Sequence, residues 1–356
     1  MSLEILDGLI ITPVKEVILD LFKLETRQAI AYITIAYIVA FFLYLHRKRK
    51  PQKNTEKYSS FWNFIGGNKV YFHKSAIIDY QFYFMRVIFG NLILLPIFAF
   101  LIAPEFISGE IWGQWWQALL GPNEDVIEKT TTTTIIYALV LFIVGDFSHY
   151  WVHRIFHSGL LWEFHKVHHS AEVLVPQTAN RVHTVETLAE RLSYITLSTP
   201  FTGLFIYLYG EPISGYTILG ALYTYMIFNA IASNLRHSHV WLSFGPFWEH
   251  FINSPAQHHI HHSTNPAHFN KNFGTNLSIW DWMFGTLHIT SPDEEELEFG
   301  LAPEENANYD NVIELFYKPF IMFYKAVRDR FTSKGTATIS NEQKEQTTSA
   351  SEELPP

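Results

Sequence analysis

Long apolar stretches alternate with polar segments along the chain, and their lengths predict helices that span a membrane. A helix needs roughly 20 residues to cross the hydrocarbon core of a bilayer. Five stretches approach or reach that length: 28–45, 82–103, 134–147, 192–210 and 213–232. The last two are separated only by Glu211 and Pro212, which predicts a helical hairpin. We therefore predict an all-α integral membrane protein with four or five transmembrane helices.

Basic residues set the predicted orientation, because they favour the cytoplasmic side of a membrane. The segment after the second stretch carries only Lys129, whereas a basic cluster follows the first stretch directly: Arg47, Lys48, Arg49, Lys50, Lys53 and Lys57. Counting five crossings then places residues 148–191 and 233–356 in the cytosol as a helical cap. The expected location is the endoplasmic reticulum or a bacterial inner membrane.

Composition narrows the candidate chemistry. The chain is 48% hydrophobic and only 17% charged, which favours a lipid environment over an aqueous one. It contains no cysteine, so iron–sulfur clusters and thiolate zinc sites are excluded, and any metal must be held by histidine and carboxylate. The net charge of −9 argues against a nucleic-acid partner.

Histidines are crowded into three short segments of the predicted cap: DFSHYWVHRIFH, WEFHKVHHS and SPAQHHIHHS, which begin at residues 146, 162 and 254. Helix positions three or four apart lie on one face, so one HxxxH pair and two HxxHH triplets predict helical faces that present imidazoles: His153, His157, His165, His168, His169, His258, His261 and His262. A structural zinc takes four ligands. Eight rings therefore predict two metal ions, and imidazole suits iron, copper and zinc alike.

These segments, followed by NKNFGTNLSIWDWMFGTL (270–287), resemble the fatty acid hydroxylase and sterol desaturase superfamily of membrane-bound, histidine-ligated di-iron oxygenases. The sterol desaturase branch is the most similar in pattern. The resemblance implies two further ligands, His237 in NLRHSHVW and His183 in RVHTVE, although Thr184 stands where many members have proline. It also implies two iron ions, with zinc as a possible substitute, and O2 as co-substrate.

The resemblance implies a lipid hydroxylase or desaturase that acts on a sterol-like or fatty-acyl C–H bond. The chain has no dinucleotide-binding loop, so electrons must come from a separate cytochrome b5-like or ferredoxin-like reductase. The implied organisation is an amphipathic segment, transmembrane helices with a cytosolic loop, a fatty acid hydroxylase-like catalytic domain, a C-terminal extension and a disordered tail: 1–27, 28–139, 140–288, 289–331 and 332–356.

Other roles compete with ligation for some residues. His149 and His259 are expected to be outer hydrogen-bonding groups, and Asp146 and Glu186 to orient ligand rings or cap helices. Four tryptophans are expected to anchor the spans at the cytosolic boundary, although some could line a lipid channel: Trp151, Trp162, Trp280 and Trp282. The alternative function is a membrane transition-metal transporter or metal-buffering protein. Transport would favour ionisable residues inside the spans, and the predicted spans contain few.

Overall fold

A computed structural model describes residues 30–50, 54–89, 108–124, 126–213, 233–306 and 309–331, together with Lys15 and Leu19. Apart from loops and two isolated β-bridges, the described residues form helices. The predicted all-α class is confirmed. Most of the predicted amphipathic segment 1–27 lies outside the described residues, as does the predicted tail 332–356.

The longer helices carry most of the architecture. They are α3 (Ile30–Lys48), α6 (Lys74–Phe89), α8 (Gly109–Leu120), α9 (Thr131–Phe156), α11 (Thr184–Tyr209) and α18 (Val312–Phe331). Shorter helices lie between them: α4 (Phe61–Phe64), α5 (Gly67–Tyr71), α10 (Trp162–His169), α13 (Asn234–Arg236), α14 (Gly245–Trp248), α15 (Pro255–His262), α16 (Ile279–Met283) and α17 (Pro303–Asn306). Three 3-10 turns complete the described elements: Gly159–Leu161, Pro176–Asn180 and Pro266–His268.

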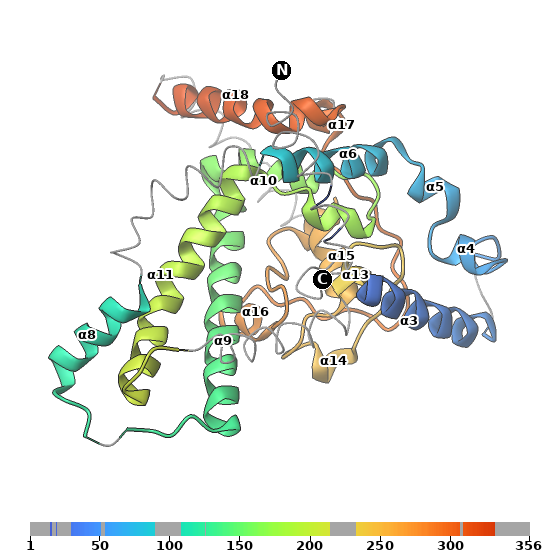
Figure 1. Cartoon of the computed structure of the whole chain (residues 1–356). Helices are drawn as coiled ribbons and strands as arrows, with labels where there is room; N and C mark the ends of the chain where they lie inside the picture. Colours follow the sequence, from blue (N-terminus) through green and yellow to red (C-terminus); the bar gives the residue numbers. More distant parts are fainter. Residues whose placement is uncertain are drawn as a thin grey trace, which may run out of the picture.

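Helices α9 and α11 run side by side, and α8 packs against α11 (Figure 1). The start of α9 is stabilised by a capping box, in which the side chains of Thr130 and Thr133 each accept a backbone N–H. The contact between α8 and α11 is very close, because a Cβ added at Gly203 would lie 2.3 Å from the Cβ of Trp112. Glycine is therefore required at this crossing.

Among the described residues, α3 and α9 are long and apolar enough to cross a bilayer. Both expose apolar side chains, including Phe42 on α3 and Ile135 on α9, as a lipid-facing helix would. The predicted stretch 192–210 is helical, but it forms the second part of α11. The predicted spans 82–103 and 213–232 lie largely outside the described residues. The described helices therefore supply two candidate spans, fewer than the four or five predicted.

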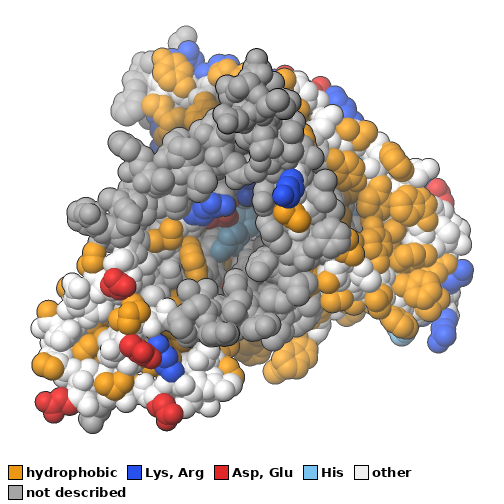
Figure 2. Space-filling view, viewed as in Figure 1, with side chains coloured by type: hydrophobic (Ala, Val, Ile, Leu, Met, Phe, Trp, Pro, Cys, Tyr) orange, Lys and Arg blue, Asp and Glu red, His pale blue; other side chains and the backbone are white. Residues whose placement is uncertain are grey.

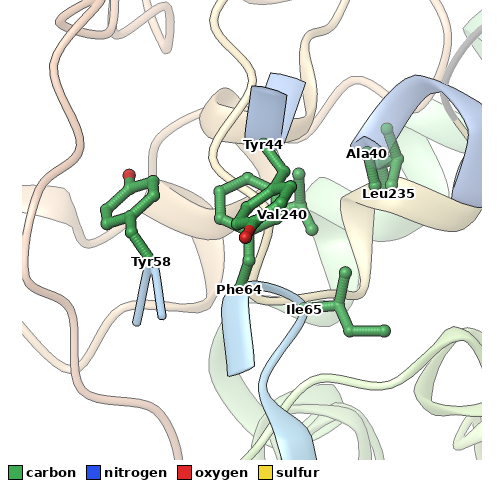
Figure 3. Close-up of a cluster of buried hydrophobic side chains, with 7 residues drawn as sticks. All are labelled: Ala40, Tyr44, Tyr58, Phe64, Ile65, Leu235 and Val240. Atoms are coloured by element: carbon green, nitrogen blue, oxygen red, sulfur yellow. The ribbon is translucent and has the colours of Figure 1, made fainter. Parts of the chain in front are cut away.

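An aromatic cluster fixes α3 to the cap. Tyr44 of α3 packs on Phe64 of α4 with ring centroids 5.6 Å apart, and Leu235 and Val240 complete the buried cluster (Figure 3). The outer surface of this region is strongly apolar, and hydrophobic side chains dominate the right of the face in Figure 2, over α3 to α6. This surface includes exposed Phe41, Phe42, Trp62 and Phe72.

The last described helix, α18, covers α10 (Figure 1). Phe316 of α18 stacks on Phe82 of α6 at 4.6 Å, and Phe164 of α10 packs against Phe320 and Phe323 at 5.3 Å each. The segment predicted only as a C-terminal extension thus buries the outer face of a helix that carries three of the predicted ligands.

Candidate metal centre

The C-terminal end of α9, α10, α15 and the residue after α13 bring nine of the ten predicted ligands into two groups. The first group, called centre A, contains His153, His157, His165, His169 and His261. The second, called centre B, contains His168, His237, His258 and His262. Within each group the ligating atoms all lie within 4.8 Å of one another. Two groups of imidazoles match the prediction of two metal ions.

Each HxxHH helix serves both centres. On α10, His165 and His169 belong to centre A and His168 to centre B. On α15 the division is reversed, because His258 and His262 belong to centre B and His261 to centre A. The spacing predicts one shared face for each triplet. In the structure the i, i+4 pair points to one centre and the intervening i+3 ring to the other.

The distances between ring nitrogens fit shared metal ions. Nitrogens bound to one ion at about 2.1 Å lie roughly 3.0 to 3.4 Å apart for tetrahedral or octahedral angles. In centre B the Nε2 atoms of His168 and His237 are 3.3 Å apart, those of His237 and His258 3.0 Å, and those of His258 and His262 3.1 Å. In centre A the Nε2 atoms of His157 and His261 are 3.2 Å apart.

Burial keeps these rings neutral, as metal ligation requires. Removal from water lowers the pKa of His168 to about 3 and that of His261 to about 4, and it lowers the pKa of His169 and His262 well below the usual range for histidine. Crowding by neighbouring imidazoles acts in the same direction. At neutral pH each ring therefore has a lone pair free for a metal.

Three rings of centre A are held by outer hydrogen bonds. Nδ1–H of His165 donates to Oε1 of Glu186 at 2.7 Å, which is one of the two roles considered for this carboxylate from the sequence. Nδ1–H of His153 donates to the carbonyl oxygen of Phe273 at 2.8 Å, and that of His261 to the carbonyl oxygen of Lys271 at 2.9 Å. Each bond fixes the tautomer and leaves Nε2 for the metal.

The loop that supplies these carbonyls is itself held by Asp281. Its carboxylate accepts the backbone N–H groups of Phe273 and Gly274, each at 2.8 Å, and the hydroxyl of Thr286 at 2.6 Å. A Cβ at Gly274 would lie 2.4 Å from the carbonyl oxygen of Leu277, so the loop needs glycine there. Burial raises the pKa of Asp281 to about 6, which leaves it ionised at neutral pH. Sequence reasoning missed this role, although Asp281 stands inside the quoted WDWMFGT motif.

Asp146 does not contact a ligand ring. Its carboxylate accepts the backbone N–H groups of Asn276 and Leu277, both at 3.1 Å, and the indole N–H of Trp280 at 3.0 Å. It therefore ties α9 to the loop that follows Phe273. Of the two carboxylates considered from the sequence for orienting a ligand ring, Glu186 has this role and Asp146 does not.

His183 is the predicted ligand that the structure places elsewhere. It precedes α11, where its Nδ1 accepts the backbone N–H of Val185 at 3.2 Å. Its Nε2–H donates to the carbonyl oxygen of Phe316 on α18 at 3.1 Å. Both nitrogens are used, and burial lowers the pKa of His183 to about 4. In this geometry His183 caps one helix and attaches another, and it joins neither centre.

His149 and His259 also lie outside the two groups. Nδ1 of His149 pairs with Oε1 of Glu190 at 3.1 Å, and the ring is 5.8 Å from that of His153. Nε2–H of His259 donates to the carbonyl oxygen of Leu235 at 3.2 Å, two residues before the ligand His237. Both rings thus occupy the outer positions expected from the sequence.

A pocket of about 670 Å³ opens beside the metal groups. His157, His169 and His261 of centre A line it, and centre B contributes His262. Trp162 also lines it, with its ring 5.1 Å from that of His157 and 5.3 Å from that of His169. The pocket-lining position of Trp162 favours the channel alternative over the anchor at the membrane boundary. The volume is in the range of small-ligand sites.

The structure thus has two compact groups of neutral imidazoles, most of them buried, beside a partly apolar pocket. Both groups are suited to binding a metal ion. Residues 138–286 match the family model described as "Fatty acid hydroxylase". This match agrees with the resemblance that the histidine motifs predict, and the named relatives are lipid hydroxylases, monooxygenases and sterol oxidases.

Several named relatives match about half of the chain. An alkylglycerol monooxygenase from Danio rerio is 29% identical over 51% of this chain and 36% of its own length. An ornithine lipid hydroxylase from Rhizobium tropici is 34% identical over 45% of this chain and 44% of its own length. A C-4 methylsterol oxidase from Schizosaccharomyces pombe is 28% identical over 48% and 53%. The comparison with solved structures found no match.

These matches cover only part of each relative: the chain spans between about a third and just under half of the first relatives' length. They also revise the predicted branch. The sterol enzymes are more distant than the alkylglycerol monooxygenases and the ornithine lipid hydroxylase, so the sterol desaturase branch is not the nearest named group.

Proposed function

We propose that the protein is an O2-dependent, di-iron membrane oxidoreductase that hydroxylates a lipid C–H bond. The observation that carries the proposal is the pair of neutral imidazole groups, of which one lines a pocket large enough for part of a lipid. Nine histidines serve as ligands in this proposal, five at centre A and four at centre B. His183 keeps the structural role described above.

Iron bound at the two centres would supply the oxidation of an unactivated C–H bond by O2. The chain's own residues do the rest. Glu186 and the carbonyls of Phe273 and Lys271 hold three rings in place, and the apolar walls near Trp162 exclude water and position the lipid.

Hydroxylation is favoured over desaturation because the relatives that match with 29–34% identity are named as a monooxygenase and a hydroxylase. The electrons would come from a separate cytochrome b5-like or ferredoxin-like partner, since the chain contains no cysteine to hold a cluster. The test is a reaction of the purified, iron-loaded protein with such a donor, a candidate lipid and isotopically labelled O2. Label in the lipid supports a hydroxylase, a new double bond with label only in water indicates a desaturase, and no O2 consumption contradicts both.

The proposed topology has four or five spans, with both histidine-bearing regions in the cytosol and the segment 140–288 as catalytic domain. The basic cluster at and after the end of α3 supports a cytosolic location for these regions. Because the chain has no native cysteine, single cysteines at Lys57 and Arg330 can be labelled from one side of a sealed membrane. We expect both to react from the cytosol, and labelling from opposite sides would contradict the five-span count.

A further inference from the structure

The pocket beside centre A has a polar side as well as an apolar one. Its apolar lining includes Trp162, Phe269 and Leu301, close to the ligand histidines. Its polar lining comprises hydroxyl, amide and carboxyl residues: Ser263, Thr264, Asn270, Glu298 and Glu305. A lipid that places its chain along the apolar part would therefore place its headgroup among these polar residues.

The charges at this polar side are acidic. Among the described residues that line the pocket there is neither lysine nor arginine, while two are glutamates. The nearby Lys166 pairs with one of them, because its Nζ donates to Glu305 at 3.0 Å and to Glu163 at 3.1 Å, so the acidic charge of the pocket lining rests mainly on Glu298. Arg330 of α18 lies near the pocket, because its Nη2 is 3.8 Å from the position that a Cβ on Gly159 would take. Its side chain is exposed and does not line the pocket.

The acidic segment is fixed relative to the metal ligands. The backbone N–H of Thr264 donates to the carbonyl oxygen of Glu298 at 3.0 Å, and Ser263 forms a β-bridge with Phe299. Ser263 directly follows the ligand His262. The ring of His169 lines the pocket. Its Nε2 is buried and has no hydrogen-bond partner among the described residues. The pocket therefore joins a ligand-ready nitrogen to an acidic polar side.

We propose, on the basis of the function proposed above, that this pocket selects lipids whose headgroup offers hydroxyl or amine hydrogen-bond donors and carries no anionic group. Carboxylates and amide oxygens accept such donors, whereas a free fatty acid or a phosphate monoester would bring a negative charge to a site that has carboxylates and no lining cation. The preference concerns binding, so it is separable from the oxidation chemistry.

The test is equilibrium binding without turnover. The full-length protein in neutral phosphatidylcholine nanodiscs is loaded with tritiated hexadecylglycerol, under anaerobic conditions and without an electron donor. Unlabelled hexadecylglycerol, hexadecylamine, hexadecanoate and hexadecyl phosphate then compete. We expect the first two to displace the label at concentrations roughly fivefold or more below the two anions. Equal or better displacement by hexadecanoate overturns the proposal, and so does the absence of any saturable binding.

A charge-reversal variant tests whether Glu298 contributes to the weaker binding of anionic lipids. Glu298→Lys should narrow the gap between hexadecanoate and hexadecylglycerol by about 1.5- to 5-fold, the range of an exposed ion pair. Glu296→Lys is the matched control, because this exposed glutamate lies in the same segment and does not line the pocket. An equal change in both variants would indicate a general surface effect and overturn the proposal.

The two proposals fail in different ways. Selective binding without any lipid oxidation would leave the headgroup preference standing and contradict the oxidoreductase. Equal displacement of the label by hexadecanoate and hexadecylglycerol, together with O2-dependent oxidation of a lipid, would do the reverse.

Discussion

Centres A and B share the helices α10 and α15, yet their surroundings differ. Centre A has five histidines, outer partners for three of them, and three rings that line the pocket. Centre B has four histidines, all buried, and only His262 reaches the pocket. The contrast teaches that an equivalent motif does not give equivalent sites. The neighbours of each ring decide which centre can meet a substrate.

The largest expected effect comes from removing one ligand at either centre. His261→Ala at centre A and His258→Ala at centre B should both abolish activity, because the proposed chemistry uses both ions. Elemental analysis should show about two metal ions in the wild type and a loss in each variant, with correct folding confirmed by circular dichroism. If His258→Ala keeps full activity, centre B is not part of the reaction and the comparison fails.

A smaller effect is expected from the carboxylate behind His165. Glu186→Gln keeps a side-chain oxygen that can accept the Nδ1–H bond but replaces the carboxyl group, and loss of an outer partner typically costs about 10- to 100-fold in metal affinity or activity. Metal competition with a chelator should show this weakening at centre A and not at centre B. Asp329→Asn, an exposed carboxylate on α18, provides the control. Unchanged chelator sensitivity in Glu186→Gln would show that the bond does not support the metal.

Replacing His183 should change the stability of the fold without changing the metal content. Its pKa is lowered to about 4 in the folded protein, below the ordinary value of 6.5. Its stabilising contribution is therefore complete above about pH 6.5 and is lost as the pH falls toward 4. His183→Ala should lower the free energy of unfolding by about 1 kcal/mol, the usual cost of losing a helix cap, with metal content unchanged.

Urea unfolding at pH 7 and pH 5 measures this difference, which should shrink at the lower pH. A loss of metal in His183→Ala would instead make His183 a ligand, and the geometry described here would be wrong at that position.

The smallest effects belong to the outer histidines. His259→Ala should lose less metal than His261→Ala, because His259 bonds to the carbonyl of Leu235 and acts on centre B only through the backbone near His237. His149→Ala should be milder still, since His149 pairs with Glu190 outside both groups. The half-buried His73 lies outside both groups, so His73→Ala serves as the silent reference for metal content. Equal metal loss in His259→Ala and His261→Ala would contradict the assignment of faces on α15.

The sequence predicted eight of the nine clustered ligands because helical spacing is a local property, and the family resemblance supplied the ninth, His237. It did not predict the division of α10 and α15 between two centres, which depends on how the helices cross. The role of Asp281 was also hidden, since its partners are backbone groups that no side-chain pattern reveals. His183 resembled a ligand in its motif, but α18, more than a hundred residues later, supplies the carbonyl that occupies it.

The use of main-chain carbonyls behind His153 and His261 affects how this protein tolerates substitution. The backbone carbonyl at position 271 is present whatever side chain that residue has. The Lys271 side chain is half-buried and forms no hydrogen bond with the ring of His261. A saturation library should therefore accept many residues at position 271 while rejecting insertions or deletions in the same loop. We expect substitutions to be tolerated poorly instead at Gly274 and at Asp281, ten residues after Lys271 in the chain.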